Sequence, residues 1–165
     1  MAYALLIDDD EGIRRSLARA AELSGLALDT AASWDEGLAA VQVYAPELVI
    51  ADYNLPGSRH GLKLLMEIRR LSPSVRLLLL SAYIGENDVA DIERLGLVDR
   101  AIPKTGAANT TDELLAEIVE AEKRSQQDTD WAAYAVASRE AKAVDQSDLD
   151  TLDERLKRSG GLSYS

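Results

Sequence analysis

Short apolar runs alternate with helix-like segments five times within the first roughly 125 residues, and this alternation constrains the fold more than any other feature. The strand-like runs cover residues 3–7, 26–31, 48–51, 75–80 and 99–103. Such alternation is typical of an α/β protein, with a parallel sheet and helices on both faces. Five strands favour the flavodoxin-like, doubly wound order 2-1-3-4-5, in which the first and third strands are neighbours.

The segments between these runs carry apolar residues at helical spacing. The predicted helices run from Asp10 or Glu11 to Leu23, over 34–44, from Gly61 to Leu71, over 87–95, and onward from Thr110 or Thr111. Ser33, followed three residues later by Glu36, has the pattern of a capping box at the start of the second helix.

The α/β alternation stops near residue 127, which predicts a domain of residues 1–125 and a helical extension of residues 126–165. Two more helices are predicted, over 130–143 and 148–158. The apolar residues of this tail are Trp131, Tyr134, Leu149, Leu152 and Leu156. Two amphipathic helices do not bury such a face alone. The tail therefore either folds back on the first domain or forms a surface for a partner, including a homodimer.

Composition excludes several classes of function. The formal net charge of −11 argues against direct nucleic-acid binding and against docking on anionic membranes. The tail is also too short and too acidic for a helix-turn-helix output domain. With no Cys and only His60, thiolate and multi-histidine metal sites are excluded. The N-terminal apolar run is too short for a signal peptide or a membrane helix, so we expect a cytoplasmic protein.

Polar residues follow four of the predicted strands at their carboxyl ends. They are Asp8 and Asp9, Asp52, Ser81, and Lys104. In open α/β sheets these ends meet at one edge, where ligands bind. Three carboxylates at close quarters need a cation, and an oxygen-only ligand set suits Mg²⁺. A metal, a lysine and a hydroxyl together suit a phosphoryl group, which leaves one carboxylate to act as nucleophile.

The same residues resemble the receiver domain of two-component response regulators over residues 2 to about 125. The matching stretches are Leu6-Ile7-Asp8-Asp9-Asp10-Glu11-Gly12-Ile13-Arg14, Val49-Ile50-Ala51-Asp52-Tyr53-Asn54-Leu55-Pro56-Gly57, Leu80-Ser81-Ala82 and Pro103-Lys104. Their spacing matches as well, with 44 residues from Asp8 to Asp52, 29 from there to Ser81 and 23 on to Lys104.

The resemblance implies a role for each residue. Asp52 would accept a phosphoryl group from a sensor histidine kinase or a phosphotransfer protein, and the domain would signal to an unknown downstream protein without turning over a substrate. Ser81 would be the switch hydroxyl and Lys104 would pair with the phosphoryl group. Mg²⁺ would be held by three carboxylates and one backbone carbonyl, from Asp8, Asp9, Asp52 and Asn54.

Two departures from the family stand out. Receivers usually carry an aromatic residue three positions before the lysine, and here that position is Ala101. Tyr83, two residues after Ser81, is expected to shield the phosphoryl site rather than to replace the aromatic. Lys104 is preceded by Pro103 and followed by Thr105, where the family often has Lys-Pro.

Two other functions remain open at this point. The Asp-x-Asp pattern of residues 8–10 also resembles haloacid dehalogenase-type phosphatases, in which Asp8 would be the nucleophile. That reading leaves Asp52 and the 54–57 loop unexplained and lacks a late acidic pair. A degenerate receiver that acts as a scaffold is the second alternative. The intact acidic set argues against it, and Ala101 argues weakly in its favour.

Overall fold

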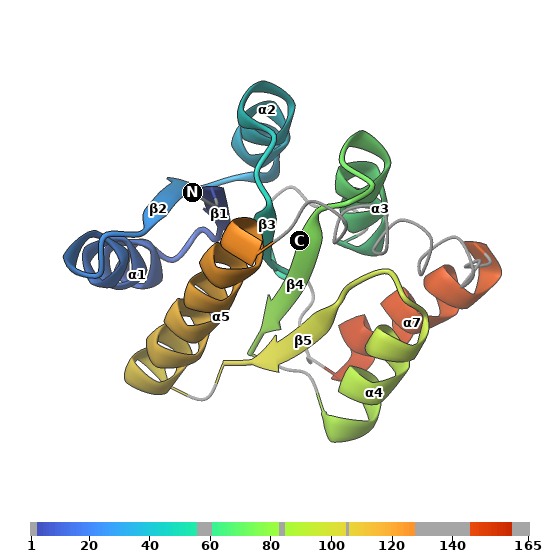
Figure 1. Cartoon of the computed structure of the whole chain (residues 1–165). Helices are drawn as coiled ribbons and strands as arrows, with labels where there is room; N and C mark the ends of the chain where they lie inside the picture. Colours follow the sequence, from blue (N-terminus) through green and yellow to red (C-terminus); the bar gives the residue numbers. More distant parts are fainter. Residues whose placement is uncertain (1–2, 56–60, 83–84, 105, 128–145, 160–165) are drawn as a thin grey trace.

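A five-stranded parallel sheet forms the centre of the molecule in the computed structural model, which describes residues 3–55, 61–82, 85–104, 106–127 and 146–159. Its strands are β1 (Tyr3–Ile7), β2 (Ala27–Ala31), β3 (Leu48–Asp52), β4 (Arg76–Ser81) and β5 (Arg100–Pro103). They lie in the order β2-β1-β3-β4-β5 (Figure 1). The predicted doubly wound topology is confirmed, and it makes β1 and β3 neighbours.

Helices cover both faces of this sheet. They are α1 (Glu11–Leu23), α2 (Trp34–Tyr44), α3 (Gly61–Leu71), α4 (Glu86–Arg94), α5 (Ala107–Gln127) and α7 (Gln146–Ser159). In Figure 1, α1 and α5 lie on one side of the sheet, and α2 and α3 lie on the other. Successive residues of β1 point to opposite faces of the sheet. Leu5 and Ile7 pack in one buried apolar core, and Ala4 and Leu6 pack in the other.

Two helix starts follow their predicted caps. The carboxylate of Asp10 accepts hydrogen bonds at the start of α1, and the hydroxyl of Ser33 accepts one from the amide of Glu36 at the start of α2. The predicted start of α5 at Thr110 or Thr111 is wrong. The helix begins one turn earlier, because the amide of Thr110 already donates to the carbonyl of Gly106. Thr110 is buried inside the first turns instead of capping them.

Of the two helices predicted in the tail, α7 matches the second and is slightly longer. The first, predicted over 130–143, lies outside the described residues. Leu149, Leu152 and Leu156 are buried in the same apolar core as Leu65 of α3 and Ile92 of α4. This helix therefore folds back on the sheet domain. None of the helices in the described ranges is long and apolar enough to cross a bilayer.

Candidate functional site

The parallel topology brings the predicted site residues to one edge of the sheet. Asp8 directly follows β1, Asp52 is the last residue of β3, Ser81 ends β4, and Lys104 directly follows β5. The strand registers align these ends, since Asp52 pairs with Leu80, next to Ser81. Asp8, Asp52 and Ser81 are all buried. Polar side chains buried this deeply need a partner or a ligand.

Three carboxylates form the acidic part of the site. Oxygen atoms of Asp8, Asp9 and Asp52 lie within 4.8 Å of one another. The backbone around Asp8 is fixed by two contacts: its amide donates to the carbonyl of Ala31 at 3.0 Å, and its carbonyl accepts from the guanidinium of Arg14 at 2.8 Å. These contacts fix the backbone at Asp8, whose carboxylate lies beside those of Asp9 and Asp52.

The two oxygens of Asp8 have different surroundings. Oδ1 accepts a hydrogen bond from the amide of Asp10 at 2.9 Å. Oδ2 is buried and has no hydrogen-bond partner in the part of the chain that the structure describes. Oδ2 forms an ion pair with Nζ of Lys104 at 3.0 Å. A buried carboxylate oxygen left in this state is suited to a metal ion.

Asp52 is held at both of its oxygens. Oδ1 accepts a hydrogen bond from the amide of Asn54 at 3.1 Å, and Oδ2 accepts one from Nζ of Lys104 at 3.0 Å. Lys104 is positioned in turn by its own amide, which donates to the carbonyl of Ser81 at 2.9 Å. The carboxylate therefore has a fixed orientation, with a cation on one side.

Burial and charge shift the pKa values of this pair. Burial, followed by repulsion from Asp8, raises the pKa of Asp52 to about 6, and Lys104 only partly offsets these effects. Burial alone would lower the pKa of Lys104. The carboxylates of Asp52 and Asp8 outweigh that effect and leave the pKa of Lys104 raised. The carboxylates of Asp8 and Asp52 thus repel each other in the folded protein, and an additional cation would reduce this repulsion.

The hydroxyl of Ser81 lies beside the loop after β3. The side-chain amide of Asn54 donates a hydrogen bond to Oγ of Ser81 at 3.5 Å. This contact connects the hydroxyl to the loop that begins directly after Asp52. The predicted role of the Asn54 backbone carbonyl as a metal ligand stays a prediction. Tyr83, His60 and Thr105 lie outside the described residues.

The residue set fits Mg²⁺. Mg²⁺ prefers carboxylate and carbonyl oxygens and retains several waters. The cluster of Asp8, Asp9 and Asp52 offers carboxylates from buried and exposed positions. Asp9 is exposed, which leaves that side of the cluster open to water.

Sequence reasoning missed two residues around the site. In the sequence, Arg14 is indistinguishable from an ordinary charged residue on the surface of α1. Its hydrogen bond to the carbonyl of Asp8 could therefore not be predicted. The hydroxyl of Tyr53, directly after Asp52, donates a hydrogen bond to the carboxylate of Asp153 in α7. No sequence pattern connects residues 100 positions apart. Ala101 is buried, with its amide donating to the carboxylate of Glu93 at 3.0 Å.

Comparisons with known proteins agree with this geometry. The family model of the response regulator receiver domain matches residues 4–119. The photosynthetic apparatus regulatory protein RegA of Cereibacter sphaeroides is 32% identical over 112 residues, which cover 68% of this chain and 60% of RegA. The acid tolerance regulatory protein ActR of Sinorhizobium medicae is 30% identical over 116 residues, which cover 70% of this chain and 57% of ActR. The matched region thus spans less than two thirds of these relatives.

Solved structures show the same fold. A receiver domain protein from Clostridium thermocellum superposes with a TM-score of 0.63 at 26% identity, covering 76% of this chain and 98% of that one. The response regulator TrrA of Thermotoga maritima, in complex with Mg²⁺ and beryllium fluoride, superposes with a TM-score of 0.58 at 27% identity, covering 72% and 99%.

Receiver domains bind Mg²⁺ at an acidic pocket, are phosphorylated by histidine kinases, and serve as signalling domains rather than turnover enzymes. These findings do not favour a phosphatase or a scaffold. The match to the family model over most of the chain, on a sheet of the same strand order, shows that this protein belongs to the receiver domain family of two-component response regulators.

Proposed function

We propose that Asp52 is the acceptor of the phosphoryl group in this receiver. One observation carries the proposal: Asp52 is the buried carboxylate at the end of the central strand β3, held 3.0 Å from Lys104 and clustered with Asp8 and Asp9. A carboxylate oxygen of Asp52 would attack phosphorus, the bond from phosphorus to the donor would break, and the donor would leave with the electron pair. The product is an acyl phosphate.

The surrounding residues supply the charges that this reaction needs. Lys104, already paired with Asp52, would neutralise one phosphoryl oxygen, and the hydroxyl of Ser81 would donate to another. Asp8, Asp9 and Asp52 would hold Mg²⁺ together with the backbone carbonyl of Asn54. The ion would neutralise charge that develops on the transferred group.

The donor in this proposal is the phosphohistidine of a sensor histidine kinase or of a phosphotransfer protein. The receiver would then pass the signal to a downstream protein. We assign the receiver to residues 1–125 and the helical extension to residues 126–165; α5 ends two residues after that division. A homodimer and the absence of direct nucleic-acid contact stay predictions.

Labelling with a small phosphodonor tests the acceptor. With acetyl phosphate and Mg²⁺, the wild type should incorporate phosphate, and Asp52→Asn should not, because an amide does not attack phosphorus. Asp35→Asn makes the same chemical change at an exposed position in the first turn of α2 and serves as the control. Labelling that persists in Asp52→Asn and is lost in Asp8→Asn would replace this proposal with the phosphatase mechanism.

A further inference from the structure

Helix α7 covers the face of the domain that carries α3 and α4. Figure 1 shows it beside both helices, at the β5 side of the sheet. Its buried residues Leu149, Leu152 and Leu156 follow a helical spacing of three and four, so a single face of α7 is apolar. This face completes one of the two cores of the receiver. An intrachain helix is therefore the occupant of this surface.

A buried polar contact ties α7 to the residue that directly follows the acceptor strand. The hydroxyl of Tyr53 donates a hydrogen bond to the carboxylate of Asp153, and both residues are buried. Tyr53 is the residue directly after Asp52, and its amide donates to the carbonyl of Leu80 at 2.9 Å. Tyr53 thus connects the chain segment beside the acceptor with Asp153 of α7.

A second set of contacts ties α7 to α4. The guanidinium of Arg155 makes ion pairs with Asp88 at 2.8 Å and with Asp91 at 2.7 Å. Asp88 lies in the first turn of α4, and α4 follows Ser81 by only a short connection. The anchor points of α7 thus lie next to the two chain segments that contact the acceptor site, after β3 and after β4.

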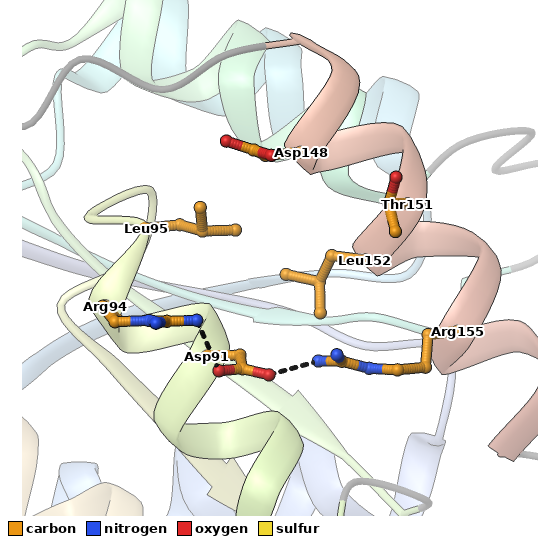
Figure 2. A pocket seen from close by; sticks show the side chains of 7 residues that line it. All are labelled: Asp91, Arg94, Leu95, Asp148, Thr151, Leu152 and Arg155. Atoms are coloured by element: carbon orange, nitrogen blue, oxygen red, sulfur yellow. Dashed lines mark hydrogen bonds and ion pairs between the residues drawn. The ribbon is translucent and has the colours of Figure 1, made fainter.

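A surface groove of about 330 Å³ lies between α4 and α7, lined by Asp91, Arg94, Leu95, Asp148, Thr151, Leu152 and Arg155. Figure 2 shows Leu152 projecting from α7 toward α4, with charged side chains around it and Asp91 bridging Arg94 and Arg155. The contact between α4 and α7 at this groove is therefore made by charged side chains and Leu152.

We propose that α7 is a phosphorylation-sensitive latch, docked on the α3–α4 face while Asp52 is unmodified and released when Asp52 carries a phosphoryl group. The inference rests on the proposed function of Asp52. A phosphoryl group would draw the hydroxyl of Ser81 and the segment after it toward Asp52. The ion pairs of Arg155 hold the first turn of α4 against that movement, so docking and phosphorylation oppose each other.

Coupling of this kind is reciprocal. If the phosphoryl group weakens docking of α7, docking of α7 weakens binding at the acceptor site by the same factor.

Ala101 is consistent with a signal that passes through α7. The position that usually carries an aromatic residue in this family holds a small buried side chain, in the same core as Leu152. The latch would carry the signal on the face where that ring is missing.

Hydrogen exchange of the full chain tests the release. The comparison is between Mg²⁺ alone and Mg²⁺ with beryllofluoride, which stands in for the phosphoryl group on Asp52. The amides of residues 149–156 should exchange at least about fivefold faster with beryllofluoride, as the helix opens locally. Tyr53→Phe removes only the hydroxyl, and it should raise exchange of the same amides without beryllofluoride.

Affinity for beryllofluoride tests the reciprocal effect. Arg155→Gln, which removes the pairs with Asp88 and Asp91, should tighten binding about two- to fivefold. Arg158→Gln is the matched control, because Arg158 is on the same helix and pairs only with the exposed Glu154 among the described contacts. Its affinity should equal that of the wild type.

Three results would overturn the latch. The first is unchanged or slower exchange in α7 while beryllofluoride is bound, and the second is equal affinity in Arg155→Gln and Arg158→Gln. In either case Asp52 would keep its proposed function. The third is the absence of a bound fluoride signal in ¹⁹F NMR, which would remove the proposed function and the latch together.

Discussion

The ammonium group of Lys104 lies 3.0 Å from Oδ2 of Asp52, across the carboxyl ends of β3 and β5. This pair is the core of the site, because it fixes the orientation of the acceptor carboxylate and supplies a cation where phosphoryl charge would develop. The pair does not neutralise the whole cluster. Asp8 and Asp9 lie within 4.8 Å, and one lysine faces three carboxylates.

The raised pKa of Asp52 predicts a pH-dependent stability. Its folded-state pKa of about 6 exceeds the ordinary aspartate value of 3.8, so the folded state binds the proton more tightly. The stabilisation is complete below about pH 3.8 and is lost as the pH rises through 6. Relative to the wild type, the free energy of unfolding of Asp52→Asn should therefore rise by about 2 kcal/mol between pH 4 and pH 7, measured by urea unfolding without Mg²⁺. An unchanged difference across this range would show that Asp52 titrates normally.

Mg²⁺ should stabilise the fold by relieving the repulsion among the carboxylates. At about ten times its dissociation constant, the ion should contribute about 1.4 kcal/mol and raise the melting temperature by about 3–6 °C. Asp9→Ala should reduce this shift, since it removes one ligand from the exposed side. Melts in NaCl of equal ionic strength give the control. If the melting temperature responds equally to both salts in the wild type, the acidic cluster does not bind Mg²⁺.

A second charged cluster, on the α5 side of the sheet, should contribute to stability. The buried carboxylate of Glu117 pairs with Arg76 at 3.1 Å and with Arg100. Burial would raise the pKa of Glu117, but Arg100 and Arg76 outweigh it and hold the pKa below 4.5. Its stabilisation is present above pH 4.5 and lost as the pH falls through the lowered value.

Glu117→Gln should therefore lower the free energy of unfolding by about 1–3 kcal/mol at pH 7 and by less at pH 3, as measured by urea unfolding. Glu113→Gln is the control, because Glu113 is more exposed and lies 3.6 Å from Arg100. It should change stability by less than about 0.5 kcal/mol. A Glu117→Gln variant as stable as the control at pH 7 would show that the paired charges add no net stability.

Helix α2 packs against β1 through Gly37. A Cβ atom at this position would lie 2.9 Å from Cγ1 of the buried Ile7 and would also clash with its Cδ1. Gly37→Ala should destabilise the protein by about 1–2 kcal/mol, although Ala is the better helix former. Adding Ile7→Val, which removes Cδ1, should recover part of the loss. Stabilisation by Gly37→Ala alone would show that α2 moves away freely.

The sequence predicted the sheet and the acidic site because both depend on local patterns. Apolar runs that end in a polar residue mark the strand ends, and the parallel topology gathers Asp8, Asp52, Ser81 and Lys104 at one edge. The start of α5 was misplaced by a turn, because Thr110 has the chemistry of a cap but is needed in the core.

The position of α7 depended on information that the sequence does not carry locally. The spacing of Leu149, Leu152 and Leu156 predicts an apolar helix face, but several surfaces of the receiver would accept such a face. The surface on which α7 docks is determined by polar partners far away in the sequence, namely the hydroxyl of Tyr53 and the carboxylates of α4. None of these residues is distinguishable in the sequence from an ordinary surface or core residue.

The identity of the phosphorylated residue decides whether Asp52 is the acceptor. After incubation with acetyl phosphate and Mg²⁺, borohydride reduces an aspartyl phosphate to homoserine, which tandem mass spectrometry locates in the chain. We expect homoserine at position 52 alone, and only when Mg²⁺ is present. Homoserine at position 8, or no modification at position 52 with Mg²⁺ and the donor in excess, would show that Asp52 is not the acceptor.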